Sequence, residues 1–165
     1  MPLKLEGSCR CGAVHFSCQS HTPSPYQRCY CSICRKTAGG GGFAINLGAD
    51  ARTLTVEDPG AAIGVFRAKI RQDDGACKLS TAERSFCSKC ATALWLFSPE
   101  WPDLVHPFAS AIDTVLPSSL NSVHLMLRFK PTWVTPQVGA GDQMFDLYPN
   151  QSIEEWHRAN KSWIE

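Results

Sequence analysis

The segment Cys29-Tyr30-Cys31-Ser32-Ile33-Cys34 limits the possible folds more than any other part of the chain, because it sets three cysteines in the spacing C-x-C-x-x-C. Side chains two residues apart in an extended segment point to the same face, so Cys29 and Cys31 can bind one ion together. A turn at Ser32-Ile33 then brings Cys34 to the same point. Since thiolates are ligands that zinc prefers, the spacing predicts a zinc site with three protein ligands.

The number of protein ligands decides what such a zinc site does. Four ligands close a structural site, whereas three leave one coordination position for water or substrate, as in catalytic zinc sites. The alternative is that Cys18, Cys77 or His21 supplies a fourth ligand, which would make the zinc at Cys29, Cys31 and Cys34 structural. The residues alone leave both alternatives open.

The nine cysteines of the chain are unevenly distributed, and seven of them fall into three groups. An odd total and closely spaced pairs fit a disulfide framework poorly, whereas clustered thiols that stay reduced are typical of metal ligands. Seven thiolates divide naturally into one closed four-ligand site, which would stabilise the fold, and one open three-ligand site. Spacing alone does not decide which groups share an ion. The groups are Cys9/Cys11, Cys29/Cys31/Cys34 and Cys87/Cys90.

Short alternating segments predict a fold that consists mainly of β-strands. Phe16 and Cys18 alternate with His15, which places Cys18 in the core and His15 at the surface. His124 also alternates with apolar residues, and we expect it on the surface of a strand. The stretch 19–25 is predicted to be a polar loop. Strands are expected within 3–18 (two strands joined by a turn), 43–47, 53–56, 63–68, 92–97, 109–112 and 123–129.

The only convincing helix signal lies near the C-terminus. Ser152-Ile153-Glu154-Glu155 is a capping box, with Ser152 at the N-cap and Glu155 at the third helical position. Four apolar residues then recur at helical spacing and predict one packing face. They are Ile153, Trp156, Ala159 and Trp163.

Length, charge and hydropathy exclude several classes of protein. The 165 residues suit one domain, residues 1–165. A net charge of +1 gives no electrostatic case for binding nucleic acid or an anionic membrane. No apolar run approaches the roughly 20 residues of a membrane span, and the N-terminus lacks a secretory signal, so we expect a cytoplasmic protein.

The order of the three cysteine groups resembles the glutathione-dependent formaldehyde-activating enzyme (GFA) family, which includes the domain of centromere protein V. Residues 7–14, Gly-Ser-Cys-Arg-Cys-Gly-Ala-Val, are similar to the family's opening G-x-C-x-C-G segment. Residues 29–36 resemble its C-x-C-x-x-C-R segment, and residues 86–90 its F-C-x-x-C knuckle. Weaker similarities are Phe43-Ala44, Ile112-Asp113 and residues 130–133, Lys-Pro-Thr-Trp.

The resemblance implies an Mss4-like zinc-binding antiparallel β fold, here with a short C-terminal helix. It implies two zinc ions per chain, a structural one and a catalytic one. Cys18 and Cys77 match no ligand of the family. Ala91 stands where the family usually has glycine, and alanine adopts a positive φ only with strain. The implied ligands are Cys9, Cys11, Cys87 and Cys90 for the structural zinc, and Cys29, Cys31 and Cys34 for the catalytic zinc.

The activity implied by the resemblance is that of a carbon–sulfur lyase similar to S-(hydroxymethyl)glutathione synthase. The expected partners are a thiol such as glutathione and a small aldehyde such as formaldehyde. Arg35 and Lys36 are candidates to offset the charge of the thiolate site or to bind the carboxylates of glutathione, and the alternative is that both are surface cations. The alternative function is a binding module without turnover, in which both zinc ions are structural.

Overall fold

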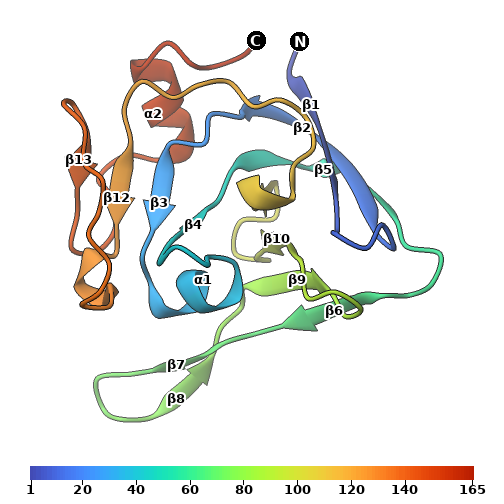
Figure 1. Cartoon of the computed structure of the whole chain (residues 1–165), viewed down its shortest axis with the longest axis horizontal. Coiled ribbons are helices and arrows are strands. Elements are labelled where there is room, and N and C mark those ends of the chain that lie inside the picture. Colours follow the sequence, from blue (N-terminus) through green and yellow to red (C-terminus); the bar gives the residue numbers. More distant parts are fainter.

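The protein is described by a computed structural model of residues 1–165, in which two β-sheets and a small hairpin carry two short α-helices (Figure 1). The expected mainly β fold with a short C-terminal helix is confirmed. The elements are β1 (Leu3–Ser8), β2 (His15–Thr22), β3 (Gln27–Cys29), α1 (Ser32–Thr37), β4 (Ala44–Ile45), β5 (Gly48–Glu57), β6 (Ile63–Phe66), β7 (Lys69–Arg71), β8 (Cys77–Leu79), β9 (Glu83–Cys87), β10 (Ala93–Phe97), β11 (Leu104–Pro107), η1 (Ala109–Ala111), β12 (Val123–Leu125), η2 (Leu127–Phe129), β13 (Gln143–Met144) and α2 (Ile153–Ala159).

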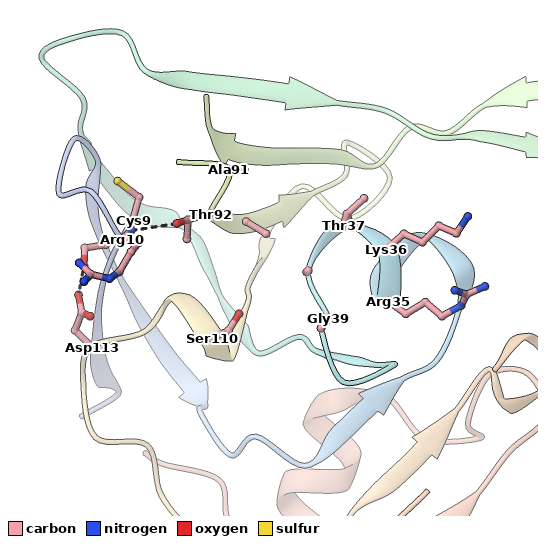
Figure 2. A pocket seen from close by; sticks show the side chains of 14 residues that line it. Cys9, Arg10, Arg35, Lys36, Thr37, Gly39, Ala91, Thr92, Ser110 and Asp113 are labelled. Atoms are coloured by element: carbon pink, nitrogen blue, oxygen red, sulfur yellow. Dashed lines mark hydrogen bonds between the residues drawn. The ribbon is translucent and has the colours of Figure 1, made fainter. Parts of the chain in front are cut away.

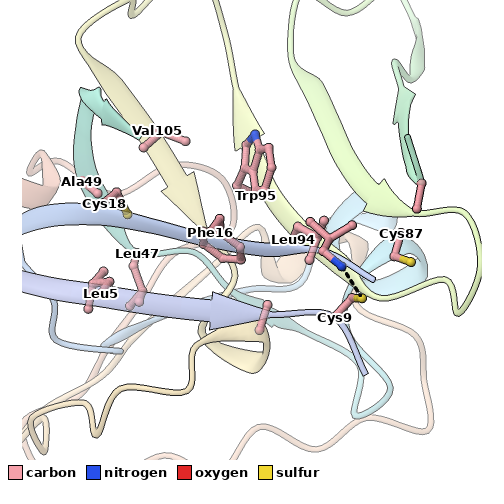
Figure 3. Close-up of a cluster of buried hydrophobic side chains, with 13 residues drawn as sticks. Leu5, Cys9, Phe16, Cys18, Leu47, Ala49, Cys87, Leu94, Trp95 and Val105 are labelled. Carbon is pink, nitrogen blue, oxygen red and sulfur yellow. Dashed lines mark hydrogen bonds between the residues drawn. The ribbon is translucent and has the colours of Figure 1, made fainter. Parts of the chain in front are cut away.

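The larger sheet has the order β1-β2-β5-β11-β10-β9-β6, and all its neighbouring strands are antiparallel. Its buried face carries Leu5, Phe16 and Leu94, and Phe16 meets Trp95 edge to face (Figure 3). Cys18 is buried in the same cluster, as the alternating pattern predicted. This core joins the first strands of the chain to β9 and β10, which flank the C-x-x-C knuckle.

The smaller sheet has the order β13-β12-β3-β4 and includes parallel pairs. β12 is parallel to β3 on one side and to β13 on the other, and Leu125 lies opposite Cys29. Parallel neighbours need long connections between them. The pairing therefore brings residues near position 125 beside the first of the three clustered cysteines.

The C-terminal helix α2 begins with the expected capping box, in which Ser152 and Glu155 each bond the other's backbone N–H. Its packing face differs from the prediction, however. Trp156 and His157 are buried, whereas Ala159 is exposed and ends the helix. Trp163 lies beyond it. The buried face of α2 includes His157, because the ring of this residue accepts a hydrogen bond from the N–H of Ser24 and donates one to the carbonyl of Ile153.

Several elements differ in type or in bounds from those that the sequence predicted. Residues 109–111 form a 3-10 helix in place of a strand, and β12 stops at Leu125 because Met126 has a left-handed φ of 59°. β2 extends to Thr22 through part of the expected loop. The turn expected after Cys31 is the first turn of α1. None of the helices is long and apolar enough to cross a lipid bilayer.

Candidate metal centres

Four cysteines from two distant turns converge at one end of the larger sheet. Cys9 and Cys11 follow β1, and Cys87 and Cys90 enclose the turn between β9 and β10. The Cys11 sulfur lies 3.6 Å from that of Cys9 and 3.8 Å from that of Cys87, and all four sulfurs lie within 4.8 Å of one another. Zn–S bonds of 2.3 Å at tetrahedral angles place sulfurs about 3.8 Å apart. The four-cysteine cluster therefore fits a closed zinc site.

The knuckle of this cluster contains the strain that the sequence predicted. Ala91 has a φ of 62°, a left-handed conformation that glycine adopts without cost. Its N–H donates to the carbonyl of Cys87 at 2.7 Å, and this hydrogen bond closes the turn. The turn that brings Cys87 and Cys90 together thus needs a left-handed residue at position 91, although the side chain of alanine disfavours that conformation.

The other three cysteines come together at the junction of β3 and α1. Their sulfurs lie within 4.8 Å of one another. Cys31 is the N-cap of α1, and its sulfur accepts a hydrogen bond from the N–H of Cys34 at 3.2 Å. Cys29 and Cys34 are buried. The three-cysteine cluster, as we call it below, offers three converging soft donors, which suits zinc.

None of the three residues considered as a fourth ligand joins this cluster. Cys18 is buried in the core of the larger sheet, and Cys77 is exposed on the β7–β8 hairpin. His21 bonds the carbonyl of Ile164 through Nδ1 and stacks on Trp163. No aspartate, glutamate or other histidine brings a donor atom to the group either.

A buried arginine that the sequence analysis missed contacts the three-cysteine cluster. Nη1 and Nη2 of Arg84 donate to the sulfur of Cys34 at 3.7 and 3.6 Å, and Nη1 also reaches the Thr37 hydroxyl at 3.4 Å. Arg84 is 8% exposed and forms no ion pair with a carboxylate. Three thiolates around Zn²⁺ leave one negative charge in excess, and this guanidinium can balance it. Nothing in the sequence distinguishes Arg84 from a surface arginine.

The charge of Cys34 reflects these contacts. Hydrogen bonds from the thiols of Cys29 and Cys31 lower the pKa of Cys34 to about 2, and the guanidinium of Arg84 acts in the same direction against the effect of burial. Both contacts favour the charged form of Cys34. Tyr148 lies near the same charges: partial desolvation, and then the charges of the three cysteines, raise the pKa of its hydroxyl.

Beside α1 lies a cleft of about 690 Å³ (Figure 2). Arg35 and Lys36 line it from α1, and Arg10 lines it from the turn after β1. In Figure 2 the side chains of Arg35 and Lys36 extend from the side of α1 that faces away from Arg10. The three clustered cysteines do not line the cleft. Thr37, which is bonded to Arg84, does, and so it connects the cleft with the cluster.

A smaller apolar pocket of about 310 Å³ adjoins this cleft. Arg84 lies in its wall, and the two cavities share Thr37, Ala91 and Ala93. The remaining walls are largely aromatic, with Phe66, Phe86 and Phe108. The two cavities thus give one cationic and one apolar surface next to the residues that contact Cys34.

His124 is a second residue that the sequence analysis placed wrongly. It is fully buried, not at the surface of a strand, because the Tyr30 side chain and Asp142, which precedes β13, both pack against its ring. Its ring lies between the hydroxyl of Tyr30 and the carboxylate of Asp142. Alternation within one strand carries no information about a later segment that covers it.

Comparison with known proteins identifies the family. The model of the glutathione-dependent formaldehyde-activating enzyme family matches residues 4–124. A protein of Halomonas elongata described as "Putative glutathione-dependent formaldehyde-activating enzyme" is 57% identical over 155 residues, which are 94% of this chain and 95% of that protein. A crystal structure of a Rhodobacter sphaeroides protein, 24% identical, shares the fold with a TM-score of 0.50 over 70% of this chain and 92% of its own. With its Mss4-like β fold, the chain belongs to the glutathione-dependent formaldehyde-activating enzyme family.

Proposed function

We propose that this protein is a zinc-dependent carbon–sulfur lyase that adds a thiol, glutathione or a similar compound, to formaldehyde or another small aldehyde. The observation that carries the proposal is the three-cysteine cluster, in which three sulfurs converge and no fourth side chain completes the set. Membership of the family and the description of the Halomonas elongata relative support the same activity. The alternative, a binding module with two structural zinc ions, would need a fourth ligand at this cluster.

In the proposed structure of the active protein each cysteine cluster holds one zinc ion. Cys9, Cys11, Cys87 and Cys90 would hold the structural ion, and Cys29, Cys31 and Cys34 the catalytic one. When bound in an open thiolate site, zinc can stabilise a thiolate or polarise a carbonyl oxygen. Arg84 offsets the excess negative charge at Cys34, so that an anionic thiolate substrate is repelled less.

The reaction itself needs no oxidant or reductant. The thiol gives up its proton, and a sulfur lone pair forms a bond to the carbonyl carbon. The π electrons of the carbonyl move to its oxygen, which takes up a proton, and the product is a hydroxyalkyl thioether. The reverse reaction breaks the same carbon–sulfur bond.

The cleft beside α1 has features that suit glutathione as the thiol. Its volume of about 690 Å³ lies within the range of small-molecule sites. Arg10 lines it, and cations pair with carboxylates such as the two of glutathione. Arg35 and Lys36 also line it, but their side chains extend from the other side of α1 and would have to turn toward the cleft to meet a ligand there (Figure 2). We propose Arg35 and Lys36 as substrate contacts, made when their side chains turn toward the cleft.

Exchange spectroscopy by NMR tests the activity, because the uncatalysed addition of glutathione to formaldehyde is itself fast. Protein at catalytic concentration should raise the rate at which free and hydroxymethylated glutathione interconvert at equilibrium, without changing their ratio. Cys31→Ser should abolish the gain. Cys77→Ser, which changes an exposed cysteine outside both clusters, should keep it. No gain with any thiol tried would overturn the proposal.

A further inference from the structure

Tyr30 lies between two members of the three-cysteine cluster, and its side chain points the other way. In an extended segment alternate side chains leave on opposite faces. Cys29 and Cys31 therefore share the face of the cluster, and Tyr30 enters the protein behind it, where it is 1% exposed. The residue that separates two candidate ligands is thus an anchor for the backbone that carries them.

The anchor ends in a chain of hydrogen bonds that is buried at Tyr30 and His124 and partly buried at Asp142. We call Tyr30, His124 and Asp142 the Tyr30 network. The hydroxyl of Tyr30 lies 3.0 Å from Nδ1 of His124, and Nε2 of His124 lies 3.1 Å from Oδ2 of Asp142. The carboxylate of Asp142 can only accept, so Nε2 donates to it. The other ring nitrogen of a neutral His124 then accepts from the Tyr30 hydroxyl.

Asp142 is itself held by the backbone. It accepts hydrogen bonds from the N–H of Ser122 at 2.7 Å and of Gly139 at 2.9 Å. These contacts hold the pKa of Asp142 at about 2, so the carboxylate stays ionised over the whole range in which the protein would work. Both ring nitrogens of the buried His124 have a hydrogen-bond partner, and a satisfied network of this kind favours one arrangement.

Backbone pairing connects the network to the cysteines. The N–H of Tyr30 donates to the carbonyl of Leu125 at 3.0 Å, and the N–H of Phe145 donates to the carbonyl of His124 at 2.8 Å. Asp142 belongs to the segment after residue 124, where the match to the family model ends. The C-terminal part of the chain thus contacts Tyr30, the residue between Cys29 and Cys31.

We infer that the Tyr30 network is a positioning device that holds Cys29 and Cys31 in metal-binding geometry. It does not touch the metal or the substrate. It restricts the conformations of the backbone at residues 29–31 before the ion binds. The two sulfurs are then already in position, and metal binding does not have to order them. The inference rests on the proposed occupancy of the three-cysteine cluster but not on the proposed reaction.

The test measures how fast the zinc-loaded protein loses its ions to an excess of the colorimetric chelator 4-(2-pyridylazo)resorcinol. Tyr30→Phe removes only the hydroxyl and should speed the loss of one of the two equivalents about 10- to 100-fold, the usual effect of outer-shell changes. The other equivalent, from the four-cysteine cluster, should leave at the wild-type rate. In cobalt-loaded protein the absorption bands of one site should shift.

Tyr26→Phe is the matched control. Tyr26 is also buried in the hydrophobic cluster that includes Cys29 and Cys34, and it stacks on Trp156, but its hydroxyl is not part of the network. The same chemical change there should leave both release rates within about twofold of wild type.

A double variant tests whether the network acts as a unit. Asp142→Asn should also speed release, and Tyr30→Phe combined with Asp142→Asn should release zinc no faster than the more affected single variant. Equal release by Tyr30→Phe and wild type, or an equal effect of Tyr26→Phe, overturns the inference while two equivalents per chain remain. A wild-type protein that releases only one equivalent overturns the proposed metal content as well. Faster release by the double variant than by either single variant would show that Tyr30 and Asp142 act independently, which overturns the inference of one positioning network.

Discussion

The two cysteine clusters differ in how the chain assembles them. The four-cysteine cluster joins Cys9 and Cys11 to Cys87 and Cys90 across most of the larger sheet, and Cys11 is exposed. The three-cysteine cluster comes from six consecutive residues and is more deeply enclosed, with Arg84 and the Tyr30 network around it. A metal that connects distant strands contributes to folding, whereas a metal in a local loop depends on the fold for its surroundings.

The largest expected effect is a difference in protein stability between variants that lose one cysteine of the four-cysteine cluster and variants that lose one of the three-cysteine cluster. Cys87→Ser should lower the free energy of unfolding by about 4 kcal/mol or more, because it removes a ligand that ties β1 to β9. Cys31→Ser should lose one metal equivalent and leave most of the fold intact. Thermal melts and metal analysis of both variants measure this. Equal destabilisation would show that both clusters are structural, and Cys77→Ser is the control without a ligand role.

A second prediction concerns the buried guanidinium of Arg84, which contacts the three-cysteine cluster and has no counterpart at the four-cysteine cluster. Arg84→Met should destabilise the zinc-loaded protein by about 3 kcal/mol, because it leaves the thiolate of Cys34 without its buried counter-ion. Urea unfolding measures the loss, and zinc analysis should show weaker retention of one equivalent.

The control for Arg84 is an arginine at the surface. Arg52 pairs with Asp50 at 2.8 Å, but its side chain is 75% exposed. Arg52→Met should therefore change stability by no more than about 1 kcal/mol. Effects of similar size for Arg84→Met and Arg52→Met would show that Arg84 does not stabilise the cluster electrostatically.

The smallest expected effect tests the strained knuckle of the four-cysteine cluster. Ala91→Gly should raise the free energy of unfolding by about 1 kcal/mol, because glycine adopts a φ of 62° without a clash of its side chain. Calorimetry of the zinc-loaded variant should show a higher Tm. Ala76→Gly, at an exposed position where the backbone shows no positive φ, should give no gain, and a gain of the same size there would refute the explanation by strain.

Features that depend on neighbouring residues could be predicted from the sequence. The spacing of Cys29, Cys31 and Cys34 brings their sulfurs together through local geometry alone, and the capping box at Ser152 starts α2 for the same reason. The alternation around Cys18 placed it correctly in the core. For the cysteine spacing and the capping box the deciding contacts span only a few residues, so the order of residues contains them. For Cys18 the order gives only the face of the strand, and the larger sheet buries that face.

Features that depend on sheet pairing were decided only by the tertiary structure. Spacing left open which cysteine groups combine, since Cys9 and Cys87 meet only through the strands between them, and the family resemblance was needed to choose. Arg84 and His124 resemble surface residues in sequence, because a strand pattern shows which side chains share a face but not what covers it. Burial of charge and the closing of a network need long-range contacts, and these arise when β12 pairs with β3 and the larger sheet brings β9 beside α1.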